Sequence, residues 1–352
     1  MHKVKLIGAT GYGGLGMIET LLRHPEFQIV AVAATQDIGK PVSAVWPYLD
    51  GWFDLPILAP EDPACRDCDC DAVVFATPDG VGQRFAPDEV ARGRKVLDYS
   101  GDFRFADPAA YAEYARRLGK DPEHKAPALL PRSVYGLTEY NRAAIASARV
   151  VGNPGCFAMA CLLGLLPAVE AGLVEPVGLV CDGKTGVSGA GKKPSAGHHF
   201  PERYDVMGAY RLAGHQHVME IEHELSRAAG ADLRVTFTAQ VVPMSRGIMA
   251  TLYGRLKPGV GQARALDCYR ERYGNEPFVK VRDGSQPADT GMVRGSNRCL
   301  VTVACDERTG TFRTVSHIDN LVKGQAGSAV QNLNALFGLP ETLGLDAPGA
   351  HP

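Results

Sequence analysis

One cysteine occupies a position that would activate it as a nucleophile. Asn153-Pro154-Gly155-Cys156 is a turn sequence, and the apolar run at 157–166 predicts a buried helix directly after it. Cys156 is therefore expected at a helix N-terminus, where unpaired N–H groups and the helix dipole favour a thiolate. A thiolate placed there can attack a carbonyl carbon. The alternative is a small buried residue that packs like alanine, but the preceding turn favours the nucleophile.

A pair of histidines is the second group that could do chemistry. His215-Gln216-His217 precedes a predicted helix at 218–228 that carries Glu220, and His198 and His199 lie nearby in sequence. Two histidines in an H-x-H pattern can ligate a metal, but no third ligand follows at a fixed spacing, so we predict no metal. A histidine general acid or base oriented by a carboxylate is the better functional interpretation. The remaining alternative is a surface histidine at a helix start.

The segment 183–193 is rich in glycine, hydroxyl and lysine residues, among them Ser188, Gly189 and Lys192. This composition predicts a loop that binds an anion. The spacing of a P-loop is absent, and a flexible, solvated loop is the alternative interpretation.

A glycine turn indicates how a cofactor would be positioned. The turn Gly8-Ala9-Thr10-Gly11-Tyr12-Gly13-Gly14 separates a predicted strand at 4–7 from a predicted helix at 15–23. Strand, glycine turn and helix in this order are typical of a dinucleotide phosphate site. The next strand, at 28–34, ends at neutral Thr35 with Lys40 nearby, which favours NADP over NAD. The alternative is a glycine turn that only connects a strand to a helix.

The remaining pattern predicts two kinds of sheet. Further apolar strands at 71–76, 95–99 and 150–151 indicate an α/β fold with a doubly wound parallel sheet. Residues 105–135 are polar, contain tyrosine and proline and show no strong periodicity, so they are expected to form a covering excursion before a short helix at 142–148. The second half predicts a mostly antiparallel sheet with helices on one face, an α+β arrangement. Its strands are expected at 177–181, 233–242, 248–255, 278–281, 299–305 and 311–315, and a helix at 326–337 follows them.

Composition excludes several classes of protein. The 352 residues carry a formal net charge of −2, which gives no case for nucleic acid or an anionic membrane. Nine cysteines and no signal-peptide pattern argue against a disulfide framework, so a reducing cytoplasm is expected. The segment Cys65-Arg66-Asp67-Cys68-Asp69-Cys70 looks like half a zinc site without a second half, and we interpret it as a polar loop.

Seven motifs occur together in one order, and their combination resembles a known family. They are the 8–14 glycine turn, Asn153-Pro154-Gly155-Cys156, Ser188-Gly189-Ala190-Gly191, His215-Gln216-His217 with Glu220, Pro243-Met244-Ser245-Arg246-Gly247, Gly295-Ser296-Asn297 and Asp319-Asn320-Leu321-Val322-Lys323-Gly324. The chain is similar to the N-acetyl-gamma-glutamyl-phosphate reductase family of the aspartate-semialdehyde dehydrogenase-like superfamily. The resemblance covers nearly the whole chain.

The resemblance implies a reversible, NADPH-dependent reduction of an acyl phosphate to an aldehyde through a cysteine thioester, in arginine biosynthesis. It implies a Rossmann-type domain at 1–152, joined by the C-terminal segment 320–352, and an α+β catalytic and oligomerisation domain at 153–319. The expected partners are the small-molecule acyl phosphate and phosphate, and the expected assembly is a homodimer or homotetramer.

The resemblance also implies roles for individual residues. Cys156 maps to the nucleophile and His215 to the acid/base, with Glu220 as its orienter. The chemistry also needs a group that stabilises the oxyanion, for which Asn153 or a backbone N–H near Cys156 is expected. The expected cofactor-binding residues are Gly8, Thr10, Gly11, Tyr12, Gly13, Gly14, Thr35, Thr77, Pro78, Ser188, Gly189 and Asn320. The expected substrate-binding residues are Ser100, Arg104, Lys192, His217 and Arg246.

Three other functions are compatible with the same residues. One is the same chemistry on aminoadipyl phosphate, free or carrier-linked, in lysine biosynthesis, and a more distant one is aspartate-semialdehyde dehydrogenase. The third is a non-catalytic, NADP-binding redox sensor. The chain departs from the family pattern at Gly16, where glutamate is expected, at Gln216, where arginine is expected, and at Val218-Met219 in place of Thr-Pro.

Overall fold

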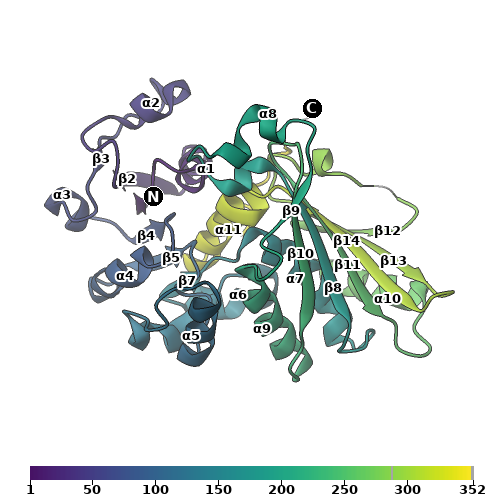
Figure 1. The fold of residues 1–352 in the computed structure, drawn as a ribbon. Coiled ribbons are helices and arrows are strands. Elements are labelled where there is room, and N and C mark those ends of the chain that lie inside the picture. Colours follow the sequence, from purple (N-terminus) through teal and green to yellow (C-terminus); the bar gives the residue numbers. More distant parts are fainter. Residues whose placement is uncertain (287, 350–352) are drawn as a thin grey trace. The chain divides into compact units, whose positions relative to one another are not determined.

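The structure is a computed structural model that describes residues 1–286 and 288–349 (Figure 1). The chain forms two compact units. Unit 1 comprises Met1–Pro154 and Gln325–Ala347, and unit 2 comprises the described residues of Gly155–Gly324 together with 348–349. The chain changes from one unit to the other at 154/155, 324/325 and 347/348, whereas the boundaries expected from the sequence are 152/153 and 319/320.

Unit 1 is built on a seven-stranded sheet in which every neighbouring pair is parallel. In spatial order its strands are β3 (Ile57–Leu58), β2 (Phe27–Ala33), β1 (His2–Ile7), β4 (Ala72–Phe75), β5 (Lys95–Asp98), β7 (Val150–Gly152) and β6 (Ser133–Tyr135). The central strand β4 is buried along its whole length, which explains why it reads as an uninterrupted apolar run. The doubly wound parallel sheet expected from the sequence is confirmed.

Helices connect the strands of this sheet. They are α1 (Tyr12–Leu21), α2 (Val42–Val45), α3 (Pro63–Arg66), α4 (Val81–Ala91), α5 (Pro108–Arg117) and α6 (Thr138–Ser147), with the shorter turns η1 (Pro47–Leu49) and η2 (Pro127–Arg132). The π-helical turn η6 (Val322–Ala326) contains the 324/325 boundary and leads into α11 (Gly327–Leu336). All ten residues of α11 are buried, and this helix packs against α1, α6 and β5.

The segment 105–135, expected as a covering excursion, contains α5, η2 and β6, three elements that the sequence did not predict. Helix α5 starts at a good capping site: the Asp107 side chain accepts a hydrogen bond from Ala109 N at 3.0 Å, and Pro108 takes the first helical position.

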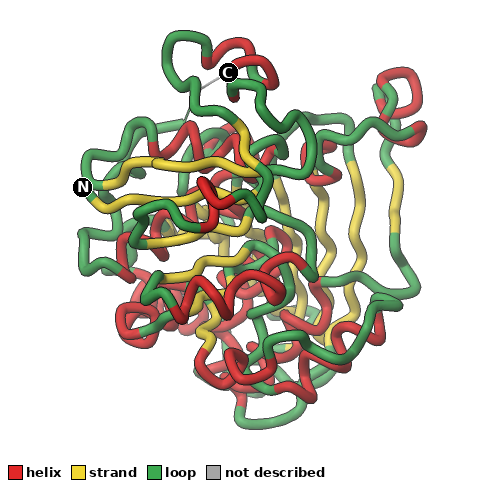
Figure 2. Tube along the Cα trace, turned by 90° about the vertical axis from the view of Figure 1, so that its left-hand side faces the viewer, coloured by secondary structure: helices red, strands yellow, loops and turns green. Residues whose placement is uncertain are grey.

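Unit 2 is built on a mixed seven-stranded sheet, whose strands lie side by side in Figure 2. Their spatial order is β12 (Val279–Asp283), β13 (Cys299–Asp306), β14 (Thr311–Ile318), β11 (Ile248–Arg255), β8 (Leu179–Thr185), β10 (Val235–Val241) and β9 (Gly208–Tyr210). The pairs β12–β13 and β8–β10 are parallel and the others antiparallel. The expected α+β arrangement is confirmed, although strand β9 was not predicted.

Three long helices of unit 2 cover one face of this sheet (Figure 1). They are α7 (Cys156–Glu170), α9 (His217–Ala229) and α10 (Gln262–Tyr273), and the short segments η3 (Val187–Ala190), η4 (Ala196–His198), α8 (Phe200–Arg203) and η5 (Thr290–Met292) complete the unit. Helix α10 was not predicted.

The central helix α7 continues through Pro167, a residue that normally breaks a helix. Proline cannot donate to the carbonyl of Leu163, four residues earlier. The hydroxyl of Tyr273 donates to that carbonyl instead, at 2.7 Å, and Tyr269 donates to the carbonyl of Gly164 at 2.5 Å. Helix α10 therefore supplies the hydrogen bond that Pro167 cannot make.

Helix α7 also lies very close to the sheet. A Cβ at Gly164 would lie 2.2 Å from a methyl group of Leu252 in β11. The helix that begins with Cys156 is thus fixed along its length by buried contacts. No helix within the described residues is long and apolar enough to cross a membrane.

Candidate active site

The predicted nucleophile is the first residue of a long, buried helix. Cys156 opens α7 and is partly exposed, and Gly155 is the N-cap, with no side chain capping the first turn. The backbone N–H of Gly155 donates to Glu220 Oε1 at 2.8 Å. Glu220 is only 1% exposed, so this charge-assisted hydrogen bond fixes the residue directly before the cysteine.

Two glycines allow the backbone around Cys156 to pack tightly. A Cβ at Gly324 would lie 2.7 Å from the Cβ of Cys156, and a Cβ at Gly155 would lie 2.2 Å from His217 Nε2. Real Cβ atoms do not make contacts this short, so a side chain at either position would force Cys156 or His217 to shift. The predicted substrate residue His217 therefore packs against the cysteine turn from α9, and the last residue of the 319–324 motif packs against the cysteine itself.

His215 is held in one tautomer. Its Nδ1 accepts the backbone N–H of His217 at 3.2 Å, which leaves the ring proton on Nε2. Burial, with a smaller contribution from the positive charge of Arg211, lowers the pKa of His215 to about 4. The ring is therefore neutral near pH 7 and presents Nε2–H as a hydrogen-bond donor.

Aromatic rings surround His215 and connect it to the cysteine. Phe157, which follows Cys156, lies 5.7 Å from the His215 ring, Phe237 lies 5.0 Å from it and Tyr210 lies 5.7 Å from it. Burial, and secondly the negative charge of Cys156, raises the pKa of Tyr210 to about 12, which places Tyr210 near the sulfur. Sequence reasoning missed Tyr210 and Phe237, because neither belongs to a recognisable motif.

A second cluster in unit 2 orients a cation. Asp319 is fully buried and lies 3.1 Å from Arg246 Nε, and it also accepts the N–H of Gly295 at 2.7 Å and the N–H groups of Leu321 and Val322. Within 1–286 and 288–349, Nη1 of Arg246 has no hydrogen-bond partner. Arg246 is thus held on one side and available to an anion on the other.

The predicted anion-binding loop at 183–193 has a different structure. Residues 183–185 belong to strand β8, and the N–H groups of Gly186 and Ser188 donate to the carbonyls of Gly247 and Ser245. The N–H groups of Gly186 and Ser188 are therefore used within the protein and are not available to bind an anion. Lys192 lies on the exposed segment after η3.

Asn320 links this loop to the Arg246 turn. Its Oδ1 accepts the N–H of Gly247 at 2.7 Å, and its Nδ2 donates to Ser188 Oγ at 3.0 Å. A Cβ at Gly189 would lie 3.8 Å from Asn320 Nδ2. The structure therefore brings together three of the predicted cofactor-binding residues, Ser188, Gly189 and Asn320, next to Arg246.

The glycine turn of unit 1 has the properties that a dinucleotide phosphate requires. Gly8 has φ +101°, and a Cβ there would lie 2.3 Å from the carbonyl oxygen of Ala76. Gly11 is the N-cap of α1, whose first turn begins with Tyr12 and has no side-chain cap. The buried Oγ1 of Thr77, beside Gly8, has no hydrogen-bond partner among the described residues. Free donors at a helix start beside an unpaired hydroxyl fit a bound phosphate.

The other predicted residues of unit 1 lie at the same edge of the sheet. Thr10 follows β1, Thr35 follows β2, Pro78 follows β4, and Ser100 follows β5. Gly13 and Gly14 lie in the first turn of α1, and a Cβ at Gly14 would meet the carbonyl oxygen of Gly8 at 2.2 Å. The carboxyl ends of parallel strands are where such sheets bind their ligands.

Asn153 and Arg104 shape the turn that leads to the cysteine. The amide of Asn153 donates to Gln325 O and Ser328 Oγ and accepts from Asn332. Arg104 Nε donates to the carbonyl of Asn153 at 2.8 Å. Both N–H groups of the Asn153 amide are thus used within unit 1, where they hold the turn.

A buried pair of carboxyls lies beside Ser100. Asp98 is fully buried and accepts the N–H of Ser100 at 2.7 Å, but its Oδ2 has no partner among the described residues. Burial, and secondly the charge of Asp102, raises the pKa of Asp98 well above its usual range. Burial also raises the pKa of Asp102. Sequence reasoning did not find this pair.

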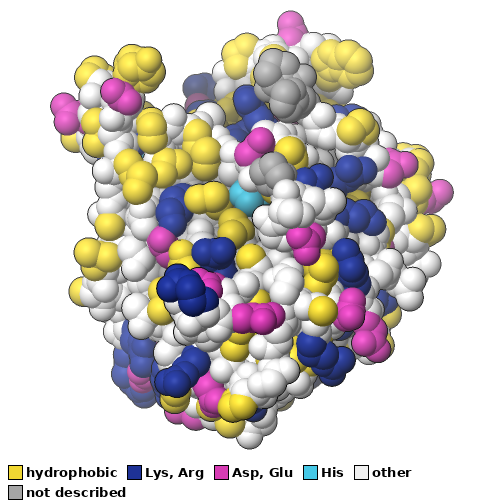
Figure 3. Space-filling view, turned by 90° about the vertical axis from the view of Figure 1, so that its right-hand side faces the viewer, with side chains coloured by type: hydrophobic (Ala, Val, Ile, Leu, Met, Phe, Trp, Pro, Cys, Tyr) yellow, Lys and Arg dark blue, Asp and Glu magenta, His cyan; other side chains and the backbone are white. Residues whose placement is uncertain are grey.

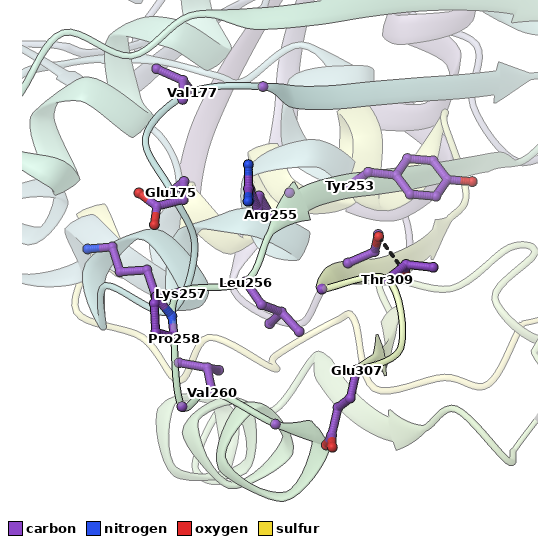
Figure 4. Close-up of a pocket in the computed structure, with 16 residues that line it drawn as sticks. Glu175, Val177, Tyr253, Arg255, Leu256, Lys257, Pro258, Val260, Glu307 and Thr309 are labelled. Atoms are coloured by element: carbon purple, nitrogen blue, oxygen red, sulfur yellow. Dashed lines mark hydrogen bonds between the residues drawn. The ribbon is translucent and has the colours of Figure 1, made fainter.

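A cavity of about 1070 Å³ opens elsewhere in unit 2, between the end of β11, the turn from β13 to β14 and the start of α10 (Figure 4). Four charged residues line it, Arg255, Lys257, Glu175 and Glu307. Among the other lining residues, Thr309 Oγ1 donates to Thr311 Oγ1 at 2.8 Å. None of the predicted site residues lines this cavity. On the face drawn in Figure 3, basic and acidic side chains are interspersed, which agrees with the small net charge.

Family models match both units. Residues 3–148 match the model described as "Semialdehyde dehydrogenase, NAD binding domain", and residues 156–320 match "Semialdehyde dehydrogenase, dimerisation domain". Together with the parallel sheet, the glycine turn and the cysteine at a helix start, these matches define an oxidoreductase of the semialdehyde dehydrogenase class that uses a nicotinamide dinucleotide.

Relatives along the full length of the chain give the family. An N-acetyl-gamma-glutamyl-phosphate reductase of Laribacter hongkongensis is 42% identical over 98% of both chains, and one of Desulforudis audaxviator is 42% identical over 100% of both. One of Symbiobacterium thermophilum is 43% identical over 97% of both. The chain belongs to the N-acetyl-gamma-glutamyl-phosphate reductase family, which confirms the resemblance seen in the motifs.

Solved structures share the fold at low sequence identity. Aspartate semialdehyde dehydrogenase II of Vibrio cholerae, complexed with ASA, has a TM-score of 0.70 and 18% identity, and the match covers 96% of this chain and 98% of that one. Aspartate semialdehyde dehydrogenase of Candida albicans, with NADP, has a TM-score of 0.63 and 16% identity over 96% and 98%.

Proposed function

We propose that the chain catalyses the reversible, NADPH-dependent reduction of N-acetyl-gamma-glutamyl phosphate to N-acetylglutamate semialdehyde and phosphate, a step of arginine biosynthesis. The main support is its identity of 40–43%, over at least 97% of its length, to reductases that carry this name. The neutral end of strand β2 at Thr35 supports NADP over NAD. We further propose a homodimer or homotetramer in the cytoplasm, an assembly supported by the match to a dimerisation-domain model.

In the proposed mechanism Cys156 is the nucleophile. The thiolate attacks the carbonyl carbon of the acyl phosphate, the bond from carbon to the bridging oxygen breaks, and phosphate leaves, so that a thioester remains on the sulfur. The uncapped first turn of α7 favours the thiolate. Glu220 acts indirectly, because its hydrogen bond to Gly155 N fixes the backbone that carries the sulfur.

His215 is placed to stabilise the oxygen of the reacting carbonyl. With Nδ1 occupied by the His217 N–H, a neutral ring can donate a hydrogen bond from Nε2 but has no proton to give up easily. The acid/base role expected from the sequence thus narrows, in our proposal, to that of a donor to the developing oxyanion. This fits the reaction, because the oxyanion formed in reduction collapses directly to the aldehyde and the Cys156 thiolate.

Arg246 is the proposed partner of the leaving phosphate. Three backbone N–H groups hold the Asp319 carboxylate, and this carboxylate in turn fixes the guanidinium of Arg246, which is therefore oriented before the phosphate binds. Reduction of the thioester needs a hydride, which is the chemistry that a bound reduced nicotinamide supplies. Gly8, Thr10, Gly11, Tyr12, Gly13, Gly14 and Thr77 are the residues that would hold the dinucleotide's phosphates.

The test is a steady-state assay in the oxidative direction with N-acetylglutamate semialdehyde, phosphate and NADP, followed by the absorbance of the reduced cofactor. Aminoadipate and aspartate semialdehydes are run in parallel, with Cys156→Ser as the control. We expect phosphate-dependent turnover that prefers the N-acetylglutamate compound and is lost in Cys156→Ser. Preference for another aldehyde would overturn the substrate assignment. Residual activity of more than a few per cent in Cys156→Ser would overturn the assignment of Cys156 as the nucleophile.

A further inference from the structure

Two polar side chains beside the glycine turn carry buried atoms that the protein itself does not pair. Tyr99 directly follows β5 and is 8% exposed, and Gln325 lies in the π-helical turn η6 and is partly exposed. Within the described residues, neither the buried hydroxyl of Tyr99 nor the buried Oε1 of Gln325 has a hydrogen-bond partner. A buried polar atom without a partner costs free energy, so two such atoms together indicate a ligand or a water that pairs with them.

Both side chains lie against the same residue of α1. A Cβ at Gly13, the second residue of this helix, would lie 3.3 Å from Tyr99 Cδ2 and 2.9 Å from Gln325 Nε2. The first turn of α1 has no side-chain cap and is the proposed site of the dinucleotide's phosphates. Glycine at this position therefore lets the ring and the amide approach the start of the helix, from which a side chain would exclude them.

Gln325 also lies beside the residues that lead to the nucleophile. Its backbone carbonyl accepts the side-chain amide of Asn153 at 3.3 Å, and Asn153 precedes Cys156 by three positions. In the proposed reaction the nicotinamide extends from the phosphates at α1 toward the carbon held by Cys156. The side chain of Gln325 lies at the first end of this path and its backbone at the second. Single π-helical turns occur frequently at functional sites, which agrees with this position.

We propose that Tyr99 and Gln325 bind the carboxamide of the nicotinamide, an inference that rests on the proposed NADP-dependent reaction. A carboxamide carries an NH2 donor and a carbonyl acceptor side by side. The NH2 group supplies the donor that Gln325 Oε1 lacks, and the carbonyl supplies the acceptor that the Tyr99 hydroxyl lacks. Burial raises the pKa of Tyr99, so the hydroxyl keeps its proton and remains a donor.

Gln325 is the movable member of the pair. It is partly exposed and carries its amide on three rotatable bonds, whereas Tyr99 is almost completely buried. An entering carboxamide can therefore displace the Gln325 amide while the Tyr99 ring stays in place. A ribose hydroxyl of the same dinucleotide is also both donor and acceptor, so a ligand with an altered carboxamide is needed to distinguish the two groups.

The test is calorimetric titration of the full-length protein with oxidised NADP and with its 3-acetylpyridine analogue, in which a methyl group replaces the carboxamide nitrogen. No substrate is present, so the measured Kd does not depend on turnover. We expect the wild type to bind the analogue about 3- to 10-fold more weakly than NADP, because one neutral hydrogen bond is lost. In Gln325→Met the Kd for NADP should rise by a similar factor, and the preference for NADP over the analogue should disappear.

Tyr99→Phe separates ligand binding from a structural role. Removing a buried hydroxyl that has no partner should leave the melting temperature of the free protein unchanged or raise it, while the Kd for NADP rises about 3- to 10-fold. Tyr273→Phe is the matched control, because the Tyr273 hydroxyl already donates to the carbonyl of Leu163. This control should lower the melting temperature and leave the Kd for NADP unchanged.

Three results would overturn the inference. An unchanged Kd for NADP in both Gln325→Met and Tyr99→Phe would mean that the unpaired atoms serve no part of the dinucleotide. A higher Kd in Gln325→Met with an undiminished preference for NADP over the analogue would move the contact to another group, such as the ribose. A wild type that does not bind NADP would overturn the proposed function as well, which distinguishes that failure from the first two.

Discussion

Replacing Gly324 by alanine tests whether close packing against the cysteine matters for the chemistry. The φ of Gly324 is not in the left-handed region, so alanine strains this position only through its contacts. The new methyl group would lie 2.7 Å from the Cβ of Cys156, whereas ordinary contact begins at 3.4 Å. Cys156 or the 319–324 backbone must therefore move by about 0.7 Å.

The size of the effect follows from that movement. Overpacking of this kind costs about 1–3 kcal/mol of the free energy of unfolding. A displacement of nearly 1 Å at a reacting atom costs on the order of 10- to 100-fold in rate. We therefore expect Gly324→Ala to lower kcat by 10- to 100-fold, with little change in the KM for NADP, because the glycine turn is untouched.

The matched control is Gly197→Ala, since a Cβ at Gly197 would meet no atom within 4 Å and its φ is also outside the left-handed region. Steady-state kinetics and thermal melting are measured on both variants. The rate of iodoacetamide labelling of Cys156, followed by peptide mass spectrometry, reports on the sulfur directly. If Gly324→Ala kept kcat within twofold of the wild type, with unchanged labelling of Cys156, the reasoning from close packing would be refuted.

Three further predictions concern single groups. His215→Gln keeps an N–H near the Nε2 position, so it should retain at least tenfold more kcat/KM than His215→Phe, which should lose about 10²–10³-fold; equal losses would exclude the donor role. Arg246→Ala removes the oriented cation and should raise the KM for phosphate by roughly 10-fold or more, while Arg308→Ala, at an exposed position, should not; an unchanged KM would exclude the phosphate contact. The buried Asp98 has a raised pKa, so the folded state holds a proton that the unfolded state loses above about pH 4, and stability falls as pH rises toward the folded pKa. The free energy of unfolding, measured with urea from pH 4.5 upward, should fall more steeply with pH in the wild type than in Asp98→Asn, by up to about 1.4 kcal/mol per pH unit. The same pH dependence in both proteins would contradict the raised pKa of Asp98.

The sequence predicts the strands of unit 1 well because buried parallel strands are continuous apolar runs, as in β4. It predicts the cysteine turn because Asn153, Pro154 and Gly155 each have strong local preferences. It missed α5 and α10, whose exposed faces are polar, although the Asp107-Pro108 start of α5 is a local signal that would have located that helix.

The candidate site was less predictable because its contacts join distant segments. The residue types at Cys156, His215 and Arg246 indicate chemistry without any structure. The contact of Gly324 with Cys156, and the hydrogen bond from Gly155 to Glu220, depend on how segments more than 60 residues apart fold together. Local composition also suggested an anion-binding loop at 183–193, but the N–H groups of Gly186, Val187 and Ser188 donate to the neighbouring turn that contains Arg246.

Helix α7, which begins with the nucleophile, does not complete its own hydrogen bonding. The carbonyl of Leu163 is paired by the hydroxyl of Tyr273, a residue 110 positions further along the chain. The helix that carries Cys156 therefore reaches its final form only after α10 has been synthesised and has packed against it, so a chain that stops before α10 would leave the reactive sulfur on an incomplete support.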